Sequence, residues 1–205
     1  MITTEMLNSL REIVSSRLTQ KRYNHTVGVE KMARFLAENC LPDKINKVSA
    51  AALLHDITKE LTKDVQTQIL MTSDNCSQIY RDIDLAVLHS FTAPIIVKKE
   101  FPCFADAEIL SAVKKHTLGD EVMSVFDKII FLADFIEEGR IYPDSVLTRN
   151  FVIDSMIPGE TEKNIEILNR ACIMEIDSTI SHLERLGKSV NRITYLAKKS
   201  ILSKM

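Results

Sequence analysis

A histidine and an aspartate stand side by side, His55-Asp56, where an apolar run ends in the segment AALLHDITKE. The run, residues 50–54, is typical of a buried helix, so both side chains are expected to lie against the core. An imidazole and a carboxylate are costly to bury unless something pairs with them. The dipeptide is not specific by itself, and its interpretation depends on the rest of the chain.

Three more histidines and one more aspartate occupy comparable places. His25 opens a predicted helix in RYNHTVGVEKMARFLAE, His89 lies in DLAVLHSFTAP, and His116 ends a predicted helix in AEILSAVKKHTLGD. Asp134 interrupts the otherwise apolar residues 129–136. A carboxylate in such a helix face needs a metal, a cation or hydrogen bonds to offset its burial.

Considered singly, each histidine is compatible with a core or capping role, and Asp134 with a buried cap of another helix. Together, the imidazoles, Asp56 and Asp134 form a set of nitrogen and oxygen donors suited to a first-row divalent ion. Such an ion would also pair with His55 and Asp56. A divalent ion can lower the pKa of bound water from ~16 toward ~7, so such a site could supply hydroxide at neutral pH.

The elements that position these residues are predicted to be helices. Apolar residues recur at intervals of three and four, and the chain has only five glycines and five prolines, which indicates an all-α fold. Helices are expected over residues 4–19, 24–40, 44–55, 62–72, 82–99, 106–117, 122–137 and 161–186. Asp43, Asp106 and Thr161 are expected caps of three of them.

The domain organisation is predicted to be a single domain over residues 1–205. A catalytic helical body is expected at about 20–140 and a C-terminal helical extension at about 160–205. Residues 139–159 are predicted to be a loop inside this domain. The apolar stripe of the long helix at 161–186 is expected to serve as core or as the face of a homodimer.

The composition is that of an ordinary globular protein, with 45% hydrophobic residues, 26% charged residues and a net charge of −2. This balance is untypical of a nucleic-acid or membrane-surface binder. Residues 1–14 lack the features of a signal peptide, and no run approaches the ~18 apolar residues of a membrane span. Scattered cysteines favour free thiols in a reducing compartment, so a cytoplasmic protein is expected.

The order of His25, His55-Asp56, His89, His116 and Asp134 resembles the HD superfamily of metal-dependent phosphohydrolases, which is all-helical. Within it, the chain is similar to the YqeK family of symmetrical bis(5′-nucleosyl)-tetraphosphatases. The matching segments, spread over most of residues 20–188, are KRYNHTVGVEKMARFLAE, AALLHDITKEL, VLHSFTAPIIVKKEF, AVKKHTLG, MSVFDKIIFLADFIEEGR and STISHLERLGK.

The resemblance implies that His25, His55, Asp56 and Asp134 hold the catalytic metal, which is usually iron in this family. Other members of the superfamily bind a second ion at positions like His89 and His116, so both one ion and two are open. The residues expected in catalysis are His55, Asp56, Lys59, His116 and Asp134. Those expected to bind the nucleotide and its phosphates are His25, Lys59, His89, His116, Thr117, Asp134, Arg140, Gly187 and Lys188.

The implied reaction converts diadenosine tetraphosphate into two ADP. Lys59 follows His55 by one helical turn and could supply a fixed positive charge near the metal. Arg140 follows Gly139, where a helix is expected to end, so its planar fork could clasp a phosphate bidentately. His116 could donate a hydrogen bond or a proton to the leaving oxygen.

Two other functions are compatible with the sequence. The chain could hydrolyse a nucleoside monophosphate or an alarmone, or it could be a non-catalytic nucleotide-binding module. The C-terminal segment GKSVNRIT departs from the family, since Asn191 and Arg192 stand where His-Pro is expected. Outside the ligand pattern, Glu137-Glu138 is predicted to be a solvated helix end and His182 a surface or core histidine.

Overall fold

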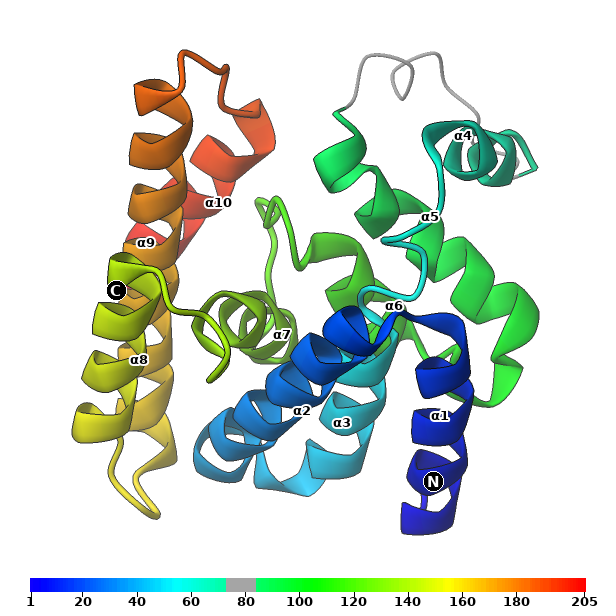
Figure 1. The fold of residues 1–205 in the computed structure, drawn as a ribbon. Helices are drawn as coiled ribbons and strands as arrows, with labels where there is room; N and C mark the ends of the chain where they lie inside the picture. The colour runs from blue at the N-terminus through cyan, green and yellow to red at the C-terminus, as the bar shows by residue number, and fades with distance from the viewer. Residues whose placement is uncertain (73–83) are drawn as a thin grey trace.

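The computed structural model describes residues 1–72 and 84–205, and all regular secondary structure in these two ranges is helical (Figure 1). The all-α prediction is therefore confirmed. The α-helices are α1 (Thr4–Arg17), α2 (Gln20–Cys40), α3 (Ile45–Leu54), α4 (Lys63–Met71), α5 (Leu85–Glu100), α6 (Ala107–Lys115), α7 (Val125–Ile136), α8 (Pro143–Ser155), α9 (Thr161–Arg185) and α10 (Arg192–Leu202). Two 3-10 turns, η1 (Pro42–Lys44) and η3 (Pro102–Phe104), precede α3 and α6.

The helix expected at 24–40 begins at Gln20, because Thr19 is its N-cap and accepts a hydrogen bond from the Arg22 backbone N–H. Of the expected caps, Asp106 is confirmed, since its side chain accepts from the backbone of Glu108. The other two were wrong: a 3-10 turn precedes α3, and α9 begins without a side-chain cap. The expected start of the fifth helix at residue 82 lies outside the described residues.

Helix α8 corrects the prediction of a loop at 139–159. Proline is tolerated at the first position of a helix, where its missing N–H is not needed, and Pro143 occupies that position. The buried face of α8 consists of Ser145, Thr148 and Val152. Two of these three residues are hydroxylated, so the apolar periodicity that identifies an amphipathic helix is absent from the sequence.

Helix α7 lies at the centre of the molecule and packs against α2, α3, α6, α8 and α9 (Figure 1). Its residues Phe126, Ile129, Ile130, Leu132 and Ile136 are almost entirely buried. Each such side chain contributes about 1.5–3 kcal/mol on burial. Because Asp134 belongs to this helix, the packing of the core fixes where its carboxylate lies.

Helix α9 packs against α7, α8, α2 and α10. The Leu168, Cys172 and Ile176 side chains of its apolar stripe are buried within this chain, which confirms the core role for this part of the stripe. Cys40 and Cys172 are buried free thiols, whereas Cys103 is exposed. None of the described helices has the length and apolar character needed to cross a membrane.

Candidate metal centre

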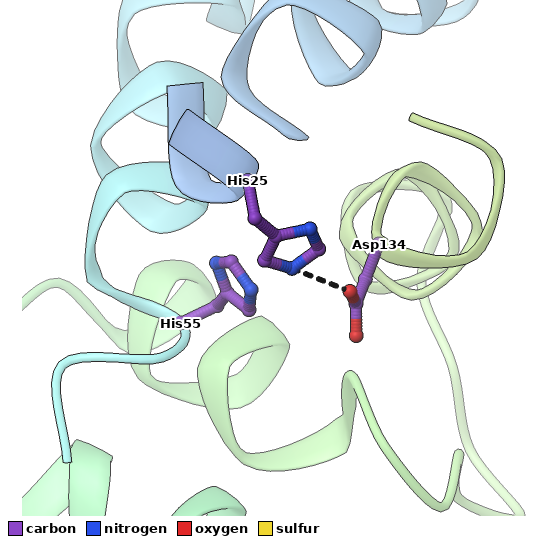
Figure 2. A group of neighbouring side chains, drawn as sticks. All are labelled: His25, His55 and Asp134. Atoms are coloured by element: carbon purple, nitrogen blue, oxygen red, sulfur yellow. Dashed lines mark ion pairs between the residues drawn. The ribbon is translucent and has the colours of Figure 1, made fainter. Parts of the chain in front are cut away.

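The predicted ligands come from separate elements that converge beside α7. His25 lies in the second turn of α2, His55 and Asp56 follow the last residue of α3, and Asp134 lies near the end of α7. Figure 2 shows the His25 ring between the His55 ring and the Asp134 carboxylate, with its Nε2 3.0 Å from Asp134 Oδ1. The fold thus brings together residues that are 109 positions apart (134 − 25).

Asp56 lies at the centre of the cluster. Its Oδ2 is 3.4 Å from His55 Nε2 and 3.8 Å from His25 Nε2. Its Oδ1 is 3.1 Å from His89 Nε2 and 3.7 Å from His116 Nε2. All of the predicted imidazoles therefore direct the same ring nitrogen toward one buried carboxylate.

The other ring nitrogens show why Nε2 is free to act as a ligand. His55 Nδ1 is 2.6 Å from the Ala52 carbonyl oxygen, and His116 Nδ1 is 2.7 Å from that of Val113. A carbonyl oxygen can only accept, so each Nδ1 carries the proton and donates it. In the neutral imidazole, Nε2 then has the lone pair that binds a metal ion.

Buried polar atoms in the cluster lack the hydrogen bonds that such atoms normally make. His25 Nε2, His55 Nε2 and Asp56 Oδ1 are buried and have no hydrogen bond of normal geometry in the described part of the chain. Unsatisfied buried groups of this kind are rare in proteins. A divalent ion would satisfy these atoms, and imidazole and carboxylate are ligands that such ions accept.

Two overlapping groups in the described residues have the geometry of a metal site. They are His25, His55 and Asp134, and His55, Asp56 and His116, with candidate ligand atoms within 4.8 Å of one another in each group. His55 belongs to both groups. His89 belongs to neither, although its Nε2 is 2.9 Å from His116 Nε2.

Neighbouring groups in the cluster lower the pKa of both aspartates. Burial would raise the pKa of Asp56, but the neighbouring His55, His116 and His89 hold it well below its usual value. Burial likewise opposes ionisation of Asp134, but the neighbouring His25 and Arg140 outweigh it and lower the pKa. Both carboxylates are therefore ionised at neutral pH, as metal ligands must be.

Glu137 is a further member of the cluster and corrects a prediction. It is 4% exposed, not a solvated helix end, and its Oε1 lies 3.1 Å from His25 Nδ1. Burial would lower the pKa of His25, but the carboxylates of Asp134 and Glu137 raise it to about 9. Glu137 Oε2 accepts a hydrogen bond from the Gly139 backbone N–H at 2.6 Å, so the carboxylate is held in place.

We expect Glu137→Gln to weaken the binding of a divalent ion by about 10- to 100-fold, the usual effect of losing a carboxylate that orients a ligand histidine. Glu137 fixes the His25 ring so that Nε2 faces Asp134, and an amide does this less strongly. The measurement is the dissociation constant for Mn²⁺ or Co²⁺. Glu138→Gln is the matched control, because Glu138 is adjacent and exposed.

Gly28 offers an independent check of the same contact. A Cβ atom at this position would lie 2.3 Å from Glu137 Oε2, so Gly28→Ala must displace the carboxylate from His25. Metal affinity in Gly28→Ala should fall in the same direction as in Glu137→Gln. Unchanged affinity in both variants would show that Glu137 does not support the site.

Arg22 is a second residue that the sequence prediction missed. Its Nη1 donates to Asp56 Oδ2 at 2.8 Å. Arg22 and His25 are three positions apart on α2 and therefore share a helix face. This spacing of three was visible in the sequence, but the predicted helix began at residue 24 and therefore excluded Arg22.

The predicted cations lie at the edge of the cluster. Arg140 Nη2 donates to Asp134 Oδ1 at 2.6 Å, and its Nε donates to the Asp134 carbonyl at 2.9 Å. Lys59 Nζ donates to the Ala86 carbonyl at 2.8 Å and lies 3.3 Å from His89 Nδ1. Thr117 Oγ1 is 3.2 Å from His89 Nε2. The structure thus gathers every predicted residue except the C-terminal pair.

That pair, Gly187 and Lys188, lies in the turn after α9, where Gly187 has a φ of 65° and both residues are exposed. Neither residue lines the two cavities that adjoin the ligand cluster. Asn191 is the N-cap of α10 and accepts from the Ile193 N–H. The Thr194 hydroxyl then donates to the Leu118 carbonyl, so the departing segment ties α10 to the loop after His116.

Two cavities adjoin the cluster. The α2–α7 cavity, about 920 Å³, is formed by residues of α2 from Lys21 to Lys31 and by residues 137–142. The α7–α9 cavity, about 450 Å³, is formed by His116, Thr117, residues 134–145 in part, and the α9 face from Glu175 to Arg185. The exposed His182 lies on that face.

Glu175 is a buried acid on the wall of the α7–α9 cavity that the sequence prediction did not single out. Its Oε2 has no hydrogen-bond partner among the described residues. Burial, and then the charge of Asp134, raise the pKa of the Glu175 carboxyl well above its usual value. The sequence did contain a signal for this residue, because an acid stands within the apolar stripe of the helix predicted at 161–186.

Comparisons with known proteins agree with this geometry. The HD domain family model matches residues 22–139. The symmetrical bis(5′-nucleosyl)-tetraphosphatase of Bacillus subtilis (strain 168) is 30% identical over 93% of this chain and 94% of its own length. The protein of the same description from Staphylococcus aureus (strain NCTC 8325 / PS 47) is 29% identical over 92% and 95%.

A solved structure is similar over nearly the whole fold. It is a crystal structure described as a predicted HD superfamily hydrolase involved in NAD metabolism from Clostridium acetobutylicum. The two structures align with a TM-score of 0.81 and 26% sequence identity over 97% of each chain. The chain therefore belongs to the HD domain family and, within it, to the family of the symmetrical bis(5′-nucleosyl)-tetraphosphatases.

Proposed function

We propose that this chain hydrolyses diadenosine tetraphosphate symmetrically to two ADP, with a divalent metal ion as cofactor. The observation that carries the proposal is the convergence of predicted ligands beside two cavities, with three buried ligand atoms that lack a hydrogen bond among the described residues. Arg22, Lys59 and Arg140 border this cluster. The relatives that align over nearly the whole chain carry the same activity in their names. The free thiols of Cys40 and Cys172 suit the cytoplasm as the compartment.

The proposed ligands are His25, His55, Asp56 and Asp134, and the proposed ion is iron. When bound, such an ion activates water near neutral pH and polarises phosphoryl oxygens. The donor set of nitrogen and oxygen suits iron and equally suits Mn²⁺ or Co²⁺. A second ion would use His116, whose Nε2 belongs to the group formed with His55 and Asp56.

The proposed role of the cations is to neutralise the nonbridging oxygens of the tetraphosphate. Arg140 borders both cavities, and its guanidinium can donate two parallel hydrogen bonds to a phosphate. Lys59 is partly buried, and its burial lowers the pKa of the ammonium group. Thr117 and His89 supply additional polar groups beside His116.

His116 can take one of two roles, and its hydrogen bonds define them. Because Nδ1 donates to the Val113 carbonyl, neutral His116 can only accept at Nε2. It can donate a proton to a leaving oxygen only as an imidazolium. A general acid role for His116 therefore requires that it is charged in the enzyme–substrate complex.

The reaction breaks the bond between one inner phosphorus and the central bridging oxygen. The oxygen of water forms the new bond to that phosphorus, and the bridging oxygen leaves with the other half as ADP. Both products are ADP, and the protons of water pass to the leaving oxygen or to solvent. Phosphoryl transfer of this kind depends mainly on positioning and charge neutralisation.

The test is to incubate the purified protein with diadenosine tetraphosphate and Fe²⁺ or Mn²⁺ in water enriched in ¹⁸O, and to resolve the nucleotides. We expect ADP as the only product, with the label in half of the ADP molecules, because one water is consumed for two ADP. Formation of AMP and ATP would contradict symmetrical cleavage. Turnover of a nucleoside monophosphate or an alarmone instead would assign a different substrate.

A further inference from the structure

The two cavities meet at the ligand cluster. Arg140 and Tyr142 line both of them. The α2–α7 cavity contains His25, and the α7–α9 cavity contains His116 and Asp134. Predicted ligands thus line both hollows.

Symmetrical cleavage requires that both halves of the dinucleotide are bound at the cluster. If the bond at the central oxygen is cleaved, one nucleoside diphosphate half must extend from the cluster in each of two directions. Two cavities adjoin the cluster, so each could hold one of these halves. This step rests on the proposed function, since only central cleavage of a dinucleotide requires two equivalent halves to be bound.

The charges of the α2–α7 cavity suit a polyphosphate. Lys21 and Lys31 are exposed, and neither has an ion-pair partner in the described part of the chain. The Glu137 carboxylate on the same wall already contacts the His25 ring and accepts a hydrogen bond from the Gly139 N–H. Glu138 remains as the exposed acid of this cavity, so the unpaired charges are mainly positive.

The position of Lys31 along α2 suits contact with the outer phosphate or the ribose of a bound half. Lys31 follows His25 by six residues, which is about 9 Å along the helix axis. The Lys31 side chain adds reach to this, so its ammonium can meet the outer phosphate or the ribose of a half whose inner phosphate lies at His25. Gly28, between them on the same face, leaves the wall without a side chain.

The rim of the cavity offers surface for a nucleobase. Ile141 and Tyr142 are 84% and 66% exposed, respectively, so both side chains are accessible to a ligand. Bases stack on aromatic side chains, and such stacking accepts any of the bases. Tyr142 therefore provides a stacking surface at the edge shared by the two cavities.

We propose that the α2–α7 cavity binds the second nucleoside diphosphate half of the substrate, with Lys21 and Lys31 contacting its outer phosphate and ribose. The α7–α9 cavity then holds the first half. The two sites differ in charge, because the α7–α9 wall carries Asp144 together with Arg185, whereas the α2 wall carries Lys21, Arg22 and Lys31. One half should consequently bind with stronger salt dependence than the other.

The test compares Lys31→Glu with Lys99→Glu in two measurements. Lys99 is an exposed lysine in the last turn of α5 that lines neither cavity, so the control makes the same charge change elsewhere. We expect Lys31→Glu to raise the KM for diadenosine tetraphosphate about five- to tenfold with kcat within twofold. Calorimetric titration of the metal-loaded protein with ADP should show two sites of parent affinity in the parent and in Lys99→Glu, whereas in Lys31→Glu one of the two should be weakened about five- to tenfold.

The outcomes separate this inference from the proposed function. If the parent protein forms only ADP but Lys31→Glu keeps the parent KM and the parent affinity at both ADP sites, the second half binds elsewhere and the inference is overturned. If the parent protein binds a single ADP, the inference is also overturned. ADP binding does not depend on turnover, so it decides the question even for a protein that fails to cleave the dinucleotide.

Discussion

Asp56→Ala is expected to lose its bound divalent ion and its turnover together, with kcat reduced by at least about 10³-fold. Asp56 is the carboxylate toward which His25, His55, His89 and His116 all turn Nε2, at 3.1 to 3.8 Å. Its removal deletes a ligand and the negative charge that offsets a dication. His55→Ala should behave alike, because His55 belongs to both candidate ligand groups.

The measurement is metal content after loading and desalting, made alongside turnover on the same sample. Asp56→Asn serves as a second variant, since it keeps the side-chain volume and removes the charge. Asp154→Ala is the matched control, because Asp154 is an exposed aspartate of α8. Retention of the ion with full activity in Asp56→Ala or His55→Ala would refute the assignment of the ligands.

Arg140→Lys is expected to lower kcat by about 100-fold while the protein keeps its metal. Removing one well-placed donor to a developing charge typically costs 10²- to 10³-fold. Lysine preserves the charge but cannot reproduce the planar fork, which lies against Asp134 and borders both cavities. The measurement is steady-state turnover of diadenosine tetraphosphate, with metal content determined in parallel.

Metal retention distinguishes the Arg140 variant from the Asp56 variant. Arg170→Lys makes the same replacement at an exposed position of α9 and should leave turnover unchanged. Because Arg140 donates to the ligand Asp134 as well, a loss of metal in Arg140→Lys would mean that the guanidinium supports the ligand rather than the substrate. A kcat within twofold of the parent value would show that the fork is not required.

The sequence alone determined the helical elements whose buried faces are apolar. Spacing of three and four identified α1–α7 and α9, since burial of one helix face imposes that period locally. It did not identify α8, because Ser145 and Thr148 occupy most of its buried face. The order of histidines and aspartates, which is readable without coordinates, was sufficient to indicate a metal-dependent hydrolase of the HD superfamily.

Only the tertiary structure decided which polar residues meet at the site. Glu137 and Glu138 are adjacent in sequence, yet the end of α7 turns the first onto His25 and the second into solvent. The contact between Arg22 and Asp56 depends on where α2 begins and on how α2 packs against the end of α3. Periodicity is a property of one helix, whereas a site depends on the angles and depths at which several helices pack. For this reason, the sequence indicated the ligands, and the packing around α7 determined their orientation, their supporting carboxylate and the two cavities beside them.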